Sequence, residues 1–243
     1  MKPMPIAFTR FIKEIFKDAM LAAISFLPVF LGVLFKFGVP FLDTFIARQT
    51  GNIGVLSPYY LLFDLTIIFS TPIMFGYAGL MVILEERDTG ILSYLSVTPL
   101  GTKGYIVSRL VFLSAIAAVY GFVVELFFHL SDISFIQLVL GNVFSFFTGI
   151  WLICLIANLA SNKEEGLAFS KFSGFLILGP FASFFIKDWL KYLTGFLPTF
   201  WFTEYCLSGG SYGFIALAVS FILTAVYTYL TVRSTFSAYR FRG

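Results

Sequence analysis

Long apolar runs constrain the fold of this chain more than any other feature. Residues 61–84 and 105–128 are each long enough to cross a bilayer as a helix, since about 20 apolar residues suffice. Hydrophobic residues make up 59% of the 243 residues and charged residues only 12%, with 33 Phe. A soluble domain carries about 25% charge. The chain is therefore predicted to be an all-α integral membrane protein with a single membrane domain, residues 1–243, because no segment is long enough for a separate globular domain.

The apolar pattern predicts six membrane spans. Besides the two runs above, the expected spans are residues 19–39, 135–160, 172–186 and 212–232. The run at 172–186 is short: at 1.5 Å per residue it covers about 22 Å of a hydrocarbon core about 30 Å thick. We therefore expect this span to be completed by a broken segment, residues 187–211, which is re-entrant or lies in the interface before the last span.

The first 18 residues precede the first span and are predicted to form an amphipathic helix in the headgroup plane, because their apolar and charged residues separate at helical spacing. An ordinary continuation of the first span is the alternative. The apolar face contains Phe8, Phe11, Ile12, Ile15 and Phe16, and the charged face contains Arg10, Lys13, Glu14, Lys17 and Asp18.

The distribution of basic residues predicts the orientation. With six spans, twelve Lys and Arg residues fall on one side of the membrane and only Lys36, Arg48, Lys187 and Lys191 on the other. Positive charge favours the cytoplasmic side. Both termini are therefore expected in the cytosol, and segment 187–211 outside. The scattered basic residues give no sign of nucleic-acid binding.

A charged segment between the second and third spans is the strongest candidate for a functional contact. Residues 85–104 are expected on the cytosolic side, where four consecutive charged residues, a short apolar helix and a proline stop exceed the needs of a simple turn. Asp88 and Thr89 can cap the short helix. A solvated boundary loop is the alternative. The candidate contact residues are Glu85, Glu86, Arg87, Asp88, Thr89, Gly90, Ile91, Leu92 and Leu95.

Two further groups of polar residues are candidates. Lys163, Glu164 and Glu165 fall in a second cytosolic loop, residues 161–171, which is either a second partner contact or an exposed loop. Ionisable residues within spans are costly and therefore informative. Glu125 and His129 are four residues apart and share a helix face near the outer end, where they could pair, line a polar vestibule, or reach interfacial water. Asp64 is expected to cap its own helix or to line a substrate path with them.

The order of residues after Glu85 resembles the coupling region of ABC-2-type transporter permeases, roughly E-R-E-x-G-T-L-E-x-L-L-x-T-P-L. The matching residues are Glu86, Arg87, Gly90, Leu92, Leu95, Thr98, Pro99 and Leu100. Asp88 replaces Glu, while Ile91, Ser93 and Ser96 depart from Thr, Glu and Leu. The stretch from Phe196 to Trp201 is similar to that family's aromatic-proline segment, and the layout of an interfacial helix, six spans and a broken outer segment is that of type V exporters.

The resemblance implies a permease half in the plasma membrane. In this family two halves, identical or related, form a pore, and two cytosolic ABC ATPase subunits drive it, usually for export. ATP and Mg would bind the partner ATPase, because this chain has no G-x-x-x-x-G-K-[ST] phosphate loop and is expected to bind no cofactor itself. The aromatic spans suit an apolar or amphipathic cargo: a drug, a peptide or a lipid.

Other functions remain open at the level of sequence. A stand-alone secondary transporter or channel would use Glu125, His129 and Asp64 as an ion relay, and a non-transporting immunity factor would need no cargo. The single His, two Cys and scattered acids predict no metal site and no catalytic residues.

Overall fold

Every element that the computed structural model describes is helical, as predicted. The description covers the chain except residues 1–12, 14–16, 18, 91–100 and 241–243. Six of the described helices are long and apolar enough to cross a membrane, which confirms an all-α multi-pass protein with six spans. The predicted interfacial helix falls almost entirely outside the described residues.

The first helix is longer than its apolar run. Helix α2 (Ala19–Val33) continues through a π-helical turn, η1 (Leu34–Gly38), into α3 (Val39–Thr50). The sequence predicted an end at residue 39, because a proline follows there. Pro40 lies directly after the π-helical turn, and such a local change of helix type is one way in which a membrane helix accommodates proline. The helix ends instead at Gly51, whose φ of 74° is the left-handed conformation that terminates helices.

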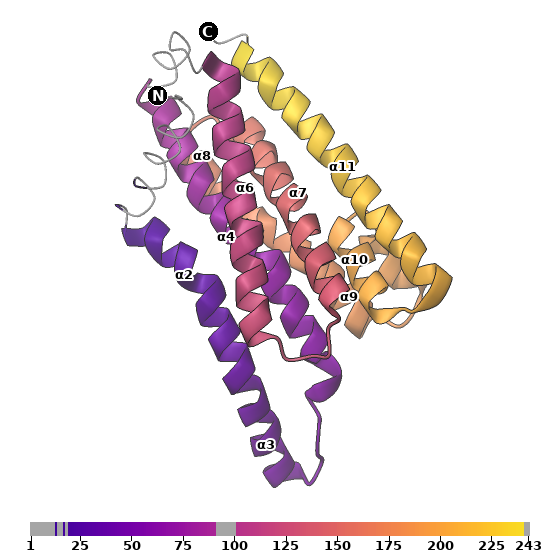
Figure 1. The fold of residues 1–243 in the computed structure, drawn as a ribbon. Helices are drawn as coiled ribbons and strands as arrows, with labels where there is room; N and C mark the ends of the chain where they lie inside the picture. Colours follow the sequence, from indigo (N-terminus) through magenta and orange to yellow (C-terminus); the bar gives the residue numbers. More distant parts are fainter. Residues whose placement is uncertain (1–12, 14–16, 18, 91–100, 241–243) are drawn as a thin grey trace.

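Three long helices form the centre of the fold: α4 (Tyr60–Asp88), α6 (Gly101–Phe128) and α7 (Phe135–Leu159). Helix α4 packs against α2, α6 and α7 and is the most deeply buried span, whereas the first and last spans keep most of their surface exposed (Figure 1). The buried rings of Phe69, Phe144 and Phe202 meet in one aromatic cluster, with centroids 5.1–6.0 Å apart. Packing against α2, α6 and α7, and against the Phe202 ring from a later segment of the chain, therefore fixes the position of α4.

The fifth span begins earlier than predicted. Helix α8 (Lys163–Ser170), the 3-10 segment η3 (Lys171–Ile177) and α9 (Leu178–Phe185) together form a 23-residue span. The predicted cytosolic loop at residues 161–171 is thus mostly helix. The charged first turn hid this start, because apolar periodicity begins only at Phe172. The span therefore needs no completion by the segment that follows it.

That following segment is nevertheless broken, as predicted, and it folds back along the bundle. It consists of η4 (Trp189–Thr194) and α10 (Pro198–Leu207). At the start of α10, the Thr199 hydroxyl donates to the Leu176 carbonyl at 2.6 Å, in the middle of the fifth span. At its other end, the Cys206 carbonyl accepts from Gln137 in the first turn of α7, at 3.5 Å. Helix α10 therefore runs from the middle of the fifth span to the end of the bundle at which α7 begins. Helix α11 (Gly210–Arg240) follows it.

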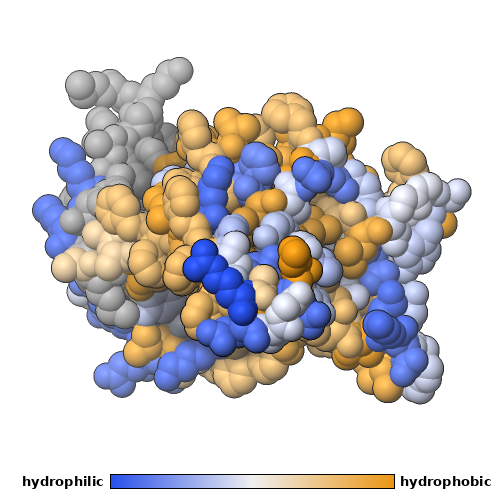
Figure 2. All heavy atoms as spheres, turned by 90° about the horizontal axis from the view of Figure 1, so that it is seen from below, coloured by the Kyte–Doolittle hydropathy of each residue, from blue (hydrophilic) through white to orange (hydrophobic). Residues whose placement is uncertain are grey.

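The bundle has two distinct ends. At one, called here the junction end, α4 ends and α8 and α6 begin. At the other, the far end, lie the turn between α6 and α7 and the turn between α3 and α4 (Figure 1). Seen from the far end, hydrophilic residues are spread among hydrophobic ones (Figure 2). A mixed surface of this kind suits the membrane boundary.

Candidate coupling site and buried polar residues

The end of α4 and the start of α8 are joined by two polar contacts on one residue. The Lys163 ammonium lies 2.8 Å from a Glu85 carboxylate oxygen, and the backbone N–H of Lys163 donates to Asp88 at 3.0 Å. The second contact satisfies one of the free N–H groups at the N-terminus of α8, where a negative charge is also favourable. Two candidate groups that were predicted separately therefore form one site, called here the α4–α8 junction.

The junction also includes the end of α7. The Arg87 guanidinium donates to the carbonyls of Ala157 and Ala160, at 3.4 and 2.6 Å. The last carbonyls of a helix have no partners within it and carry partial negative charge, so a cation stabilises them. Arg87 thus ties α4 to α7 at the same end at which Lys163 ties it to α8.

Local capping explains why α8 begins where it does. The Asn162 side chain accepts from the N–H of Glu165 at 2.8 Å, the standard N-cap contact. Glu165 in turn accepts from the N–H of Ser161 at 2.6 Å. Glu164 is exposed in the same turn, and its side chain forms no hydrogen bond or ion pair with the residues that the structure describes. Of the three predicted residues, Glu164 therefore remains accessible to a partner.

Helix α8 lies directly on α4. A methyl group added at Gly166 would come within 2.1 Å of the buried Leu84 side chain. Gly90 follows the end of α4 with φ of 71°, and its N–H donates to the Arg87 carbonyl at 3.1 Å. Glycine suits this position at the end of α4, because the left-handed conformation is costly for other residues.

The remaining predicted contact residues divide into three cases. Thr89 caps the C-terminus of α4, and its hydroxyl donates to the Glu85 carbonyl at 2.8 Å. Glu86 is only 7% exposed, so it is not a surface residue in this conformation. Asp88 is the last residue of α4 and caps α8 across the junction, while the short helix that it was expected to cap lies outside the described residues. Ile91, Leu92 and Leu95 lie outside the described residues.

Asp64 does not cap its own helix, contrary to the sequence expectation. Its carboxylate accepts the N–H groups of Leu130 and Ser131, both at 2.8 Å, and the Ser131 hydroxyl at 2.5 Å. It therefore holds the turn between α6 and α7 against α4. Both carboxylate oxygens of Asp64 accept hydrogen bonds from this turn at the far end of the bundle. These contacts explain the position of Asp64 without a role in a substrate path.

Glu125 and His129 do not pair through their side chains. The His129 ring contacts the backbone carbonyl of Glu125 at 3.0 Å and is exposed at the turn. The Glu125 side chain is fully buried, and neither of its oxygens has a hydrogen-bond partner among the described residues. Of the two residues, only His129 is therefore exposed, and the expected side-chain pair does not form.

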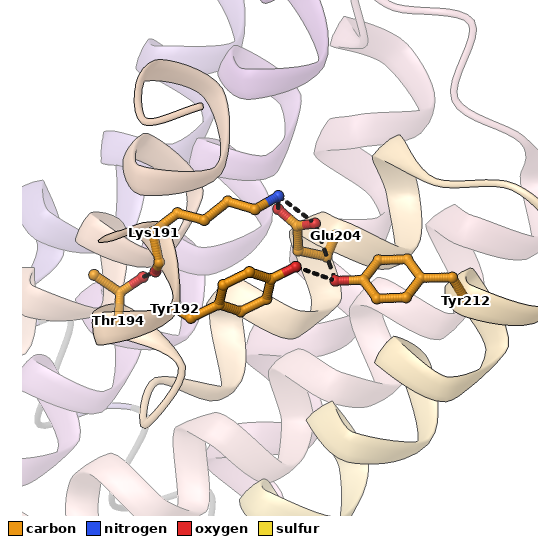
Figure 3. Close-up of polar contacts among 5 residues, drawn as sticks. All are labelled: Lys191, Tyr192, Thr194, Glu204 and Tyr212. Carbon is orange, nitrogen blue, oxygen red and sulfur yellow. Dashed lines mark hydrogen bonds and ion pairs between the residues drawn. The ribbon is translucent and has the colours of Figure 1, made fainter. Parts of the chain in front are cut away.

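One polar cluster was not singled out from the sequence. The Lys191 ammonium in η4 contacts both oxygens of Glu204 in α10 at 2.9 Å, and Glu204 also accepts from Tyr212 of α11 at 3.4 Å (Figure 3). Tyr192 and Tyr212 hydroxyls lie 3.3 Å apart. Glu204 is almost fully buried. The available signal was two opposite charges thirteen residues apart in an aromatic stretch. Their ion pair joins η4 to α10, and Tyr212 joins the pair to the last span.

No group of metal-ligating side chains is present among the residues that the structure describes. No curated protein and no solved structure matches the chain. The family described as fluoroquinolones export permease protein Rv2686c-like matches residues 11–236, which is most of the sequence. That match agrees with the six apolar helices and with the order of residues at the junction. The chain therefore belongs to the Rv2686c-like family of export permeases, as a multi-pass transport protein of the ABC transporter permease class.

Proposed function

We propose that this chain is the membrane half of an ATP-driven exporter, and that the α4–α8 junction receives the movement of a separate cytosolic ABC ATPase. The observation that carries the proposal is the set of contacts from Glu85, Arg87 and Asp88 to α7 and α8. A force applied at the start of α8 would reach α4 and α7 together. ATP and Mg would bind only on the partner.

The orientation follows from the same proposal. The junction end would face the cytosol, as the positive-inside rule favours. The chain would lie in the plasma membrane with both termini inside, surrounded by lipid, and a second permease half, identical or related, would complete the pore. The family description names fluoroquinolones, and the cargo of this chain is accordingly proposed to be an apolar or amphipathic compound of that kind.

Glu164 offers a sharp test, because it is exposed and reversing its charge leaves the internal contacts of the junction in place. The chain is co-expressed with ATPases encoded beside its gene, purified through a tag on the permease, and assayed for bound ATPase. Glu164→Arg should lower ATPase recovery and ATP-dependent cargo export together. Glu86 is a poor choice for charge reversal, since it is buried.

Asp132→Arg is the matched control. Asp132 is an exposed carboxylate at the far end, so its reversal changes the total charge equally but should leave ATPase recovery unchanged. If wild type and Glu164→Arg recover equal amounts of ATPase, the docking surface for the ATPase lies elsewhere on the chain. Cargo export by the purified chain without any ATPase would exclude the proposal that ATP hydrolysis on a partner subunit drives transport.

A further inference from the structure

The interface of α6 and α7 contains a carboxyl group that the coupling site does not use. Glu125, in the last turn of α6, has an exposed fraction of 0%, and both of its oxygens lack a donor among the described residues. An ionised carboxylate buried without a partner costs several kcal/mol or more in free energy. A buried acid that carries its own proton avoids most of that cost.

A second acceptor without a donor lies one helical turn away. Asn142 of α7 donates through its amide nitrogen to the Leu138 carbonyl at 2.9 Å, which fixes the side-chain orientation. Its oxygen is left buried without a partner, 3.0 Å from the position that a Cβ on Gly121 would occupy. Gly121 and Glu125 share one face of α6. This part of the interface therefore has an excess of acceptors and lacks a donor hydrogen.

The charged and titratable groups around Glu125 do not supply that hydrogen. Asp64 of α4 is an acid whose oxygens already bind the turn at Leu130 and Ser131. His129 contacts only the backbone carbonyl of Glu125, and the Lys36 ammonium of η1 donates to the Phe127 carbonyl at 2.6 Å. Helices α2 and α7 contain no charged residue.

We propose that Glu125 is a proton-binding site, occupied while the far ends of α4, α6 and α7 are packed together and emptied when they separate. Separation admits water to the carboxyl group, which can then ionise as ordinary glutamate does at neutral pH. Each closing of the far end takes up one proton. The inference does not depend on an ATPase partner, because it concerns only the packing of this chain.

Infrared spectroscopy of the purified chain in lipid vesicles tests occupancy. At neutral pH the wild type should show a carboxylic acid C=O band that Glu125→Gln removes and the control Asp132→Asn retains. The absence of such a band would overturn the proposal. That result is also the one expected if an ionised Glu125 instead receives a cationic cargo.

A thiol reporter tests the coupling to opening. Leu138 is buried in the first turn of α7, and Leu138→Cys becomes reactive to a maleimide only when the far end opens. At each pH, the labelling rate of Leu138→Cys is divided by the labelling rate of the double variant Leu138→Cys, Glu125→Gln. The division cancels the titration of the thiol itself, because both variants carry the same cysteine. This ratio should rise with pH, by up to about tenfold per unit, because opening releases one proton. A ratio that stays constant with pH would contradict the coupling.

Discussion

At the scale of single residues, Gly179 shows how closely the re-entrant segment fits the fifth span. A Cβ at this position would lie 2.6 Å from the backbone nitrogen of Phe200 and from the Thr199 hydroxyl oxygen. Backbone cannot move aside as a flexible side chain can. The close approach of α9 to the start of α10 therefore depends on the absence of a side chain at residue 179.

Gly179→Ala should consequently destabilise the protein by about 1–3 kcal/mol, the usual cost of overpacking a core. Thermal unfolding of the purified chain in detergent measures the effect. Gly174→Ala is the control in the same span, because nothing lies within 4 Å of its Cβ position. Equal unfolding temperatures for the two variants would mean that α10 does not pack against α9 in this way.

Single residues also show which parts of the site the sequence could not predict. The positions of Asp64 and Glu125 were visible in the sequence. The partners of Asp64 and the burial of Glu125 without a partner were not, because both depend on how distant helices pack. By contrast, Gly90 was predicted to belong to the contact segment from a local pattern, and its left-handed conformation is a local property.

At the scale of helices, the α4–α8 junction combines a strong and a weak contact. The Glu85–Lys163 ion pair joins side chains that are 57% and 43% exposed, so water and salt screen it. The Asp88 contact satisfies a backbone N–H at a helix terminus and does not depend on the Lys163 side chain. The register of α8 on α4 should therefore depend more on Asp88 than on Glu85.

Asp88→Ala should lower the free energy of unfolding by about 1 kcal/mol, as loss of a helix cap does. Glu85→Ala should lower it by no more than about 0.5 kcal/mol, typical of an exposed ion pair. Thermal unfolding of both variants in the same detergent compares them directly. The reverse order of stability would show that the ion pair, and not the cap, holds the junction.

Helix boundaries were the least predictable feature at this scale. The six spans themselves follow from the lengths of the apolar runs, which can be read directly from the local sequence. Their ends depend on capping and on neighbours: Pro40 is tolerated within the first helix, and Asn162 starts the fifth span inside a charged stretch. The broken segment was predictable from Pro198 and the charged residues near it, whereas the Lys191–Glu204 pair needed the fold.

At the scale of the whole molecule, the orientation in the membrane can be measured without altering the fold. Ile53 is 93% exposed in the turn between α3 and α4 at the far end, and Ser161 is exposed at the junction end. The two natural cysteines should not react with a maleimide in a labelling experiment. Cys154 is fully buried, and burial raises the pKa of the Cys206 thiol to about 12, so little reactive thiolate exists near pH 8.

A membrane-impermeant maleimide added to intact cells should therefore label Ile53→Cys at once, and Ser161→Cys only after the membrane is permeabilised. The unmodified chain, with its buried Cys154 and partly buried Cys206, is the background control. Labelling of Ser161→Cys in intact cells would show that the junction end faces the outside of the cell. A cytosolic ATPase could then not contact the α4–α8 junction.

The most direct measurement of the account as a whole is cargo flux in vesicles that contain the purified permease with its partner ATPase. A fluorescent fluoroquinolone should be transported when ATP and Mg are present, and not when either ATP or the ATPase is omitted. Flux should also be lost with Glu164→Arg and retained with Asp132→Arg. Nucleotide-independent flux by the permease alone would contradict the central claim that the α4–α8 junction couples these helices to an external ATPase.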